Sequence, residues 1–141
     1  MSEIAQDMNK LELIDRNRRF AIDVLKFVTT LPKDRLFDGL VRQLTRCSTS
    51  IGANYRAACR AKSTADFINK LKITEEEADE TNYFLDLLTE LEHKNDVAEL
   101  KRLLKESNEL AAIYSASLIT LRKNHPPTAK NRKSYIVNQR P

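Results

Sequence analysis

Five arginines recur along one stretch of the sequence at spacings that would place them on a single side of a helix. They are Arg35, Arg42, Arg46, Arg56 and Arg60. At about 100° per residue, all five directions fall within roughly 40° of their mean. A line of guanidinium groups over some ~37 Å of helix is suited to contacting successive phosphates of a nucleic-acid backbone. We call these five residues the arginine ridge, and the pattern predicts that it binds RNA or DNA.

The ridge lacks the side chains with which proteins read a base sequence. No aromatic residues that could stack on bases are interleaved with the arginines, and no helix-turn-helix is recognisable. Binding of RNA or DNA through this surface is therefore expected to be non-specific.

An alternative hypothesis gives the ridge no role in nucleic-acid binding. Residues 35–62 hold six basic side chains and one acidic one, a balance of +5, whereas residues 63–92 hold nine acidic and two basic ones, a balance of −7. Helices of opposite charge that follow one another in sequence are expected to form ion pairs with each other. The protein would then be a protein–protein interaction scaffold with charge-paired helices, and the sequence leaves both hypotheses open.

The acidic side chains and the histidines do not combine into a metal-site pattern. A cluster of acids spans residues 75–80, but a di-metal helical bundle also needs Glu-x-x-His pairs from facing helices. His93 has Glu90 three residues before it, and the other histidine, His125, has no such partner. We expect neither a metal site nor another cofactor.

No pattern of a catalytic centre is recognisable either. No nucleophile has a base at a plausible spacing, and neither a Gly-rich phosphate loop nor a GxSxG motif occurs. Cys47 and Cys59 would lie about 18 Å apart on one helix, which is beyond disulfide reach, and neither has a second metal ligand at a suitable spacing. With no signal peptide and no apolar run of about 20 residues, the sequence predicts a non-enzymatic, cytoplasmic protein with buried thiols and no membrane contact.

Four segments with helical periodicity must position the ridge. The chain of 141 residues contains only two glycines and four prolines, a composition typical of long helices rather than sheets. The apolar spacing predicts helices at about residues 11–31, 35–61, 64–93 and 96–124. Because the connections are short, we expect an all-α, antiparallel up-and-down four-helix bundle over residues 1–124.

The ends of these helices carry recognisable signals. Asp34, Ser63 and Asp96 are predicted N-caps, and Pro32 is expected to end the first helix. On the second helix, the side opposite the ridge is predicted to face the core. That side carries Leu40, Leu44, Cys47, Ile51, Tyr55 and Ala58.

Residues 125–141 differ in composition from the bundle. This segment has four basic side chains and no acidic one, and its polar character predicts a disordered tail. Lys130, Arg132 and Lys133 of the tail are expected to add to the nucleic-acid contacts of the ridge.

A resemblance to a known family is carried by the second and third predicted helices. The segment reads QLTRCSTSIGANYRAACRAKSTADFINKLKITEEEADETNYFLDLL. The matching positions are Gln43, Leu44, Arg46, Ser50, Ile51, Asn54, Ser63, Asp66, Phe67 and Glu80. The segment resembles the bacterial four helix bundle protein family, also called the large-subunit rRNA intervening-sequence protein family. Many relatives continue Asn-Ile-Ala-Glu-Gly after the asparagine, whereas residues 54–58 here read NYRAA, which makes the helix more continuous and more basic.

The resemblance implies more than the residue pattern alone does. It implies an up-and-down bundle that assembles into a ring-like homopentamer. A related branch includes the accessory variability determinant of diversity-generating retroelements, a basic pentamer that associates with a reverse transcriptase and with nucleic acid. By this analogy the expected partners are further copies of the chain, RNA or DNA, and a reverse transcriptase. The resemblance also favours an architectural role for Ser50, Asn54, Ser63 and Glu80, as a structural polar link between the second and third helices.

Overall fold

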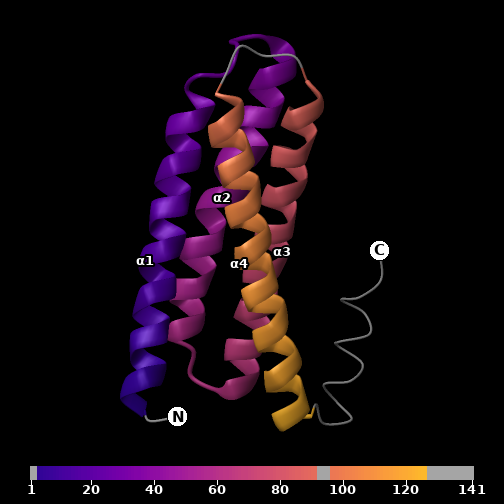
Figure 1. Ribbon diagram of the computed structural model, residues 1–141. Helices are drawn as coiled ribbons and strands as arrows, with labels where there is room; N and C mark the ends of the chain where they lie inside the picture. Colours follow the sequence, from indigo (N-terminus) through magenta and orange to yellow (C-terminus); the bar gives the residue numbers. More distant parts are fainter. Residues whose placement is uncertain (1–2, 92–95, 127–141) are drawn as a thin grey trace.

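The computed structural model describes residues 3–91 and 96–126 of the chain, and within these ranges it contains helices and no strand. Figure 1 shows four helices packed side by side, with successive helices running in opposite directions. They are α1 (Glu3–Val28), α2 (Arg35–Cys59), α3 (Thr64–Glu90) and α4 (Val97–Asn124). The predicted all-α arrangement of four packed helices is confirmed. The residues expected to form the basic tail lie almost entirely outside the described ranges.

The first helix is longer at its N-terminal end than the apolar pattern indicates. It begins at Glu3 rather than near Leu11. Leu11 itself is largely exposed. Apolar periodicity reveals the side of a helix that packs against the core, so it locates the ends of a helix only approximately.

The predicted caps are present in the structure. The side chain of Asp34 accepts a hydrogen bond from the Phe37 amide at 3.0 Å, and Ser63 Oγ accepts one from the Asp66 amide at 3.1 Å. Asp96 Oδ1 accepts the amide of Glu99 at 3.1 Å. Each cap satisfies a backbone donor that has no partner inside its helix, and so fixes where the helix starts.

The core runs along the length of the bundle and receives one side of each helix. On α2 the predicted apolar side is buried at every position except Leu40, which is half-buried. Phe37 and the small polar Ser48 join that buried side. Because this side faces inward, the opposite side of α2 with its arginines is directed to solvent.

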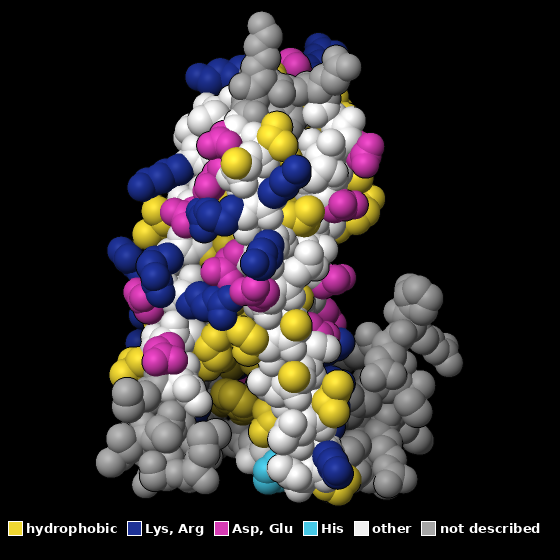
Figure 2. Space-filling model, viewed as in Figure 1, with side chains coloured by type: hydrophobic (Ala, Val, Ile, Leu, Met, Phe, Trp, Pro, Cys, Tyr) yellow, Lys and Arg dark blue, Asp and Glu magenta, His cyan; other side chains and the backbone are white. Residues whose placement is uncertain are grey.

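The four helices do not contact one another equally. The α2–α3 and α3–α4 contacts are the most extensive, whereas α1 and α4 make the least extensive contact. Ion pairs span that seam: Arg102 of α4 lies 2.9 Å from Asp23 of α1, and Arg16 of α1 lies 2.7 Å from Glu109 of α4. Figure 2 shows the resulting mixture of basic and acidic side chains over this face.

A buried polar contact also joins α1 to α4. Tyr114 and Asn17 are both fully buried, and the Tyr114 hydroxyl donates a hydrogen bond of 2.5 Å to Asn17 Oδ1. Burial raises the pKa of Tyr114 well above its ordinary value, in spite of the hydrogen bond to Asn17. Asn17 also lies close to Gly52 of α2, where an added Cβ would be 3.5 Å from Asn17 Cβ, an ordinary van der Waals contact.

Candidate nucleic-acid interface on α2

The ridge arginines lie along one side of α2, and all five side chains are exposed. Four of them are within the helix, and Arg60 is its C-terminal cap residue. The predicted line of guanidinium groups is therefore present as a line of exposed residues. The five differ in their ion pairing: Arg46 pairs with acidic side chains of α3, and the other four form no ion pair in the described ranges.

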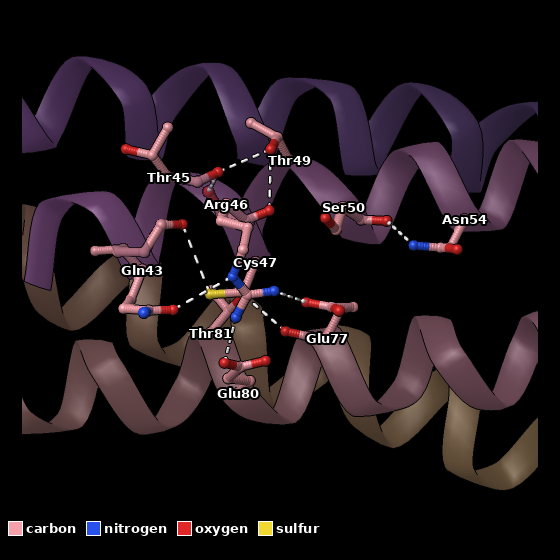
Figure 3. Close-up of polar contacts among 12 residues, drawn as sticks. Gln43, Thr45, Arg46, Cys47, Thr49, Ser50, Asn54, Glu77, Glu80 and Thr81 are labelled. Carbon is pink, nitrogen blue, oxygen red and sulfur yellow. Dashed lines mark hydrogen bonds and ion pairs between the residues drawn. The ribbon is translucent and has the colours of Figure 1, made fainter.

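Arg46 is tied to the neighbouring helix. Figure 3 shows its side chain extending from α2 toward two carboxylates of α3. Its Nη1 lies 3.3 Å from Glu77 Oε2, and its Nη2 pairs with Glu80 Oε1. The guanidinium also donates to Gln43 Oε1 at 3.3 Å. Arg46 therefore forms ion pairs between α2 and α3. The charge-pairing hypothesis expects such pairs of all five ridge arginines.

Electrostatics at this contact favour keeping the pair together. Burial raises the pKa of Glu77 above its ordinary value, and the Arg46 guanidinium only partly opposes that shift. Losing Arg46 would leave Glu77 partly buried without its cation. The contribution of this half-exposed pair to stability is modest, at most about 1 kcal/mol.

The other four ridge arginines behave differently. Arg35, Arg42, Arg56 and Arg60 make no ion pair or side-chain hydrogen bond with any residue in the described part of the chain. Each guanidinium retains its full set of N–H donors for solvent or a ligand. We call these four residues the free arginines, and they form the part of the ridge that is available to phosphates.

The four residues expected to link α2 to α3 do not form one network. Asn54 Nδ2 donates to the Ser50 carbonyl at 2.9 Å, which is a contact within α2 (Figure 3). Ser63 caps α3, as described above. Of the four, Glu80 alone forms an ion pair or side-chain hydrogen bond between the two helices in the described ranges, and its partner is Arg46. The expected link is thus replaced by the Arg46–Glu77–Glu80 cluster.

A lysine of α3 joins the basic surface at the C-terminal end of α2. Lys70 lines a shallow hollow together with Arg56 and Arg60, and its Nζ lies 3.0 Å from Asp66 Oδ2. Sequence reasoning misses Lys70 because it lies in the acidic segment. The signal that could reveal it is the antiparallel order of the helices, which brings the first turns of α3 beside the last turns of α2.

The remaining predicted residues add no further site. Lys130, Arg132, Lys133 and His93 lie outside the described ranges. Within those ranges no three His, Cys, Asp or Glu side chains gather in a group that could hold a metal ion.

Cys47 is buried as expected, and burial raises the pKa of its thiol, whereas Cys59 at the end of α2 is only half-buried. None of the described helices has the length and apolar character needed to cross a membrane.

Comparison with known proteins places this geometry in a family. Residues 9–116 match the family model described as 23S rRNA-intervening sequence protein. The chain belongs to this family. The matched range includes most of α1, the whole of α2 and α3, and most of α4, so the family assignment covers the ridge and its surroundings.

A solved structure supports the same assignment. The chain is similar to a Bacteroides thetaiotaomicron protein of unknown function from the S23 ribosomal protein family, with 32% sequence identity and a TM-score of 0.69. The similarity covers 77% of this chain and 96% of that one. No curated protein matches the chain.

Proposed function

We propose that this protein is a non-enzymatic nucleic-acid-binding bundle that holds RNA or DNA through the free arginines of α2. The observation that carries the proposal is that four guanidinium groups are exposed on one side of one helix without an acidic partner in the described ranges. A phosphate would supply a counter-charge that no acidic side chain in the described ranges provides through an ion pair. Arg46 is left out of the proposed contacts because Glu77 and Glu80 already neutralise it.

The proposed mode of binding is electrostatic. On the side of α2 that carries the free arginines, the structure shows no aromatic side chain on which a base could stack. The affinity would therefore come from contacts with phosphates and would not depend on the base sequence. Assembly into a homopentamer, which we also propose on the family resemblance, would repeat the surface five times and raise the avidity for a long strand.

A second candidate function is supported by the Arg46 cluster. Charge pairing between α2 and α3 does occur there, and the same chemistry between subunits would make the protein an interaction scaffold. Under that proposal, a reverse transcriptase or another protein would be the partner. The free arginines would then be required for assembly rather than for nucleic-acid binding.

The test compares two variants with equal loss of charge. In the first, Arg35, Arg42, Arg56 and Arg60 are replaced by Gln. The matched control replaces four exposed cations of α1 and α4 that make no ion pair in the described ranges. These are Arg18, Lys26, Lys101 and Lys105. Both variants take the formal net charge from +4 to 0, so a difference between them reports position and not total charge.

Binding is measured by fluorescence anisotropy with a labelled single-stranded RNA at about 50 mM salt, and assembly by light scattering. We expect the α2 variant to lose at least tenfold in affinity and the control to stay within about threefold of the wild type. Equal losses in both variants, or no binding by the wild type, would refute the nucleic-acid proposal. A change of oligomer size in the α2 variant alone would favour the scaffold.

A further inference from the structure

The C-terminal end of α2 borders a hollow that is lined by two of the free arginines. This hollow of about 400 Å³, open to solvent, lies where α2 adjoins the beginning of α3. Its lining consists of Ala53, Arg56, Ala57, Arg60 and Lys70. A water molecule takes up about 30 Å³, so the hollow has room for on the order of ten waters, or for a phosphate group with part of its sugar.

The two alanines create the space. Ala53 and Ala57 lie one turn apart on α2, and a side chain that stops at Cβ leaves the surface between the cations open. Their methyl groups also give the hollow an apolar base. Charges beside an apolar base are less well screened by water than charges on a fully solvated surface, so an anion held there interacts more strongly with its cations.

The charge balance favours an anion at this end of the ridge. Arg56, Arg60 and Lys70 contribute three cations, and the one carboxylate in contact with them is Asp66, 3.0 Å from Lys70 Nζ. The middle of the ridge differs, because Arg46 there is neutralised by two glutamates. In addition, α3 begins at Thr64, so the positive end of its helix dipole lies at the same end of the bundle.

We propose that this hollow is a phosphate-binding subsite that seats one phosphate of a bound RNA or DNA strand between Arg56, Arg60 and Lys70. The subsite rests on the proposed function, because it names the place on α2 where a strand is held most strongly. The two arginines supply N–H donors to phosphate oxygens, and Lys70 supplies a cation from the adjoining helix. Arg35 and Arg42, which do not line this hollow, act as weaker contacts along the same strand.

The first test uses inorganic phosphate and amide NMR spectra of the full chain at constant ionic strength, with chloride as the reference anion. In the wild type we expect saturable shifts centred on the amides of Ala53 and Ala57. The variant Arg56→Gln/Arg60→Gln should weaken this binding at least tenfold. The matched control Arg35→Gln/Arg42→Gln, with the same charge loss on the same helix, should change it less than twofold. Shifts spread evenly along α2, or equal losses in both variants, would overturn the subsite.

Two further variants test the hollow without removing its arginines. Ala57→Leu fills the space with a residue that favours helix, and we expect it to abolish the localised shifts while circular dichroism stays unchanged. Asp66→Asn removes the one carboxylate beside Lys70, and we expect phosphate to bind about three- to tenfold more tightly. Undiminished binding in Ala57→Leu, or weaker binding in Asp66→Asn, would contradict the proposed location.

A parallel titration with single-stranded RNA separates the two proposals. RNA binding that is lost in Arg56→Gln/Arg60→Gln and largely kept in Arg35→Gln/Arg42→Gln supports the subsite. RNA binding by the wild type without localised phosphate shifts overturns the subsite and leaves the proposed function standing. Localised phosphate binding without any RNA binding overturns the proposed function, and with it the assignment of the hollow to a nucleic-acid strand.

Discussion

Removing the hydroxyl of Tyr114 should destabilise the bundle even though the phenyl ring that remains fills the same space. The hydroxyl donates to Asn17 Oδ1 at 2.5 Å, and both side chains are 0% exposed. Asn17 Nδ2 is already buried without a partner. In Tyr114→Phe both ends of the Asn17 amide would therefore be unsatisfied, and a newly orphaned buried acceptor costs about 1–3 kcal/mol.

The partner substitution supplies the control. Asn17→Leu/Tyr114→Phe removes all the polar groups of the contact and replaces them with apolar ones of similar size. Because no buried polar atom is then left unpaired, we expect the double variant to be about 1–3 kcal/mol more stable than Tyr114→Phe alone. The two substitutions should thus be strongly non-additive, as residues in direct contact are.

Urea unfolding followed by circular dichroism measures these differences, at one fixed protein concentration because assembly would add to the stability of every variant. For a chain of this length, a change of 1 kcal/mol corresponds to a shift in Tm of roughly 3–5 °C. A double variant as unstable as the sum of its single variants would refute the reasoning. A Tyr114→Phe variant with wild-type stability would also refute the reasoning, because loss of the hydroxyl would then leave no costly unsatisfied acceptor.

Three smaller predictions follow from the caps and the Arg46 cluster. Ser63→Ala should lower the unfolding free energy by about 1 kcal/mol, and Ser63→Asp should not, as measured by thermal melts. Because the pKa of Glu77 is raised in the folded state, ionising this carboxyl is less favourable there than in the unfolded chain, and stability falls as the pH rises through the folded pKa. Glu77→Gln should therefore lose less stability than the wild type between pH 4 and pH 7 in urea titrations. Arg46→Glu should destabilise by about 1 kcal/mol through repulsion from Glu77 and Glu80, and adding Glu80→Arg should recover most of that loss; an unchanged double variant would argue against the interhelical pair.

The sequence predicts most of the fold because its signals are local. The caps at Asp34, Ser63 and Asp96 each depend on a hydrogen bond that spans three residues, and the stripe on α2 depends on a single helical period. Both kinds of signal are complete within one element. The N-terminal end of α1 is predicted less well, because the helix begins at Glu3 whereas the apolar spacing predicts a start near Leu11.

The candidate site is predicted only in part, because its chemistry depends on how helices are placed against each other. Periodicity puts five arginines on one side of α2, but which of them is neutralised depends on the axial register of α3. Core packing sets that register, and it brings Glu77 and Glu80 level with Arg46 and Lys70 level with Arg56. The Asn17–Tyr114 contact joins residues separated by 97 positions, and no local pattern predicts it.

The salt dependence of RNA binding tests the central claim most directly. A strand of 12 nucleotides has eleven steps of about 3.4 Å and so matches the ~37 Å of the ridge. With three phosphate contacts, one of them shared by Arg56 and Arg60, the slope of log K against log salt should be about −2.1, which corresponds to a roughly twentyfold loss of affinity between 50 and 200 mM salt. The account predicts that slope for the wild type and a slope less than half as steep once Arg35, Arg42, Arg56 and Arg60 are replaced by Gln. The same slope in both proteins would contradict it.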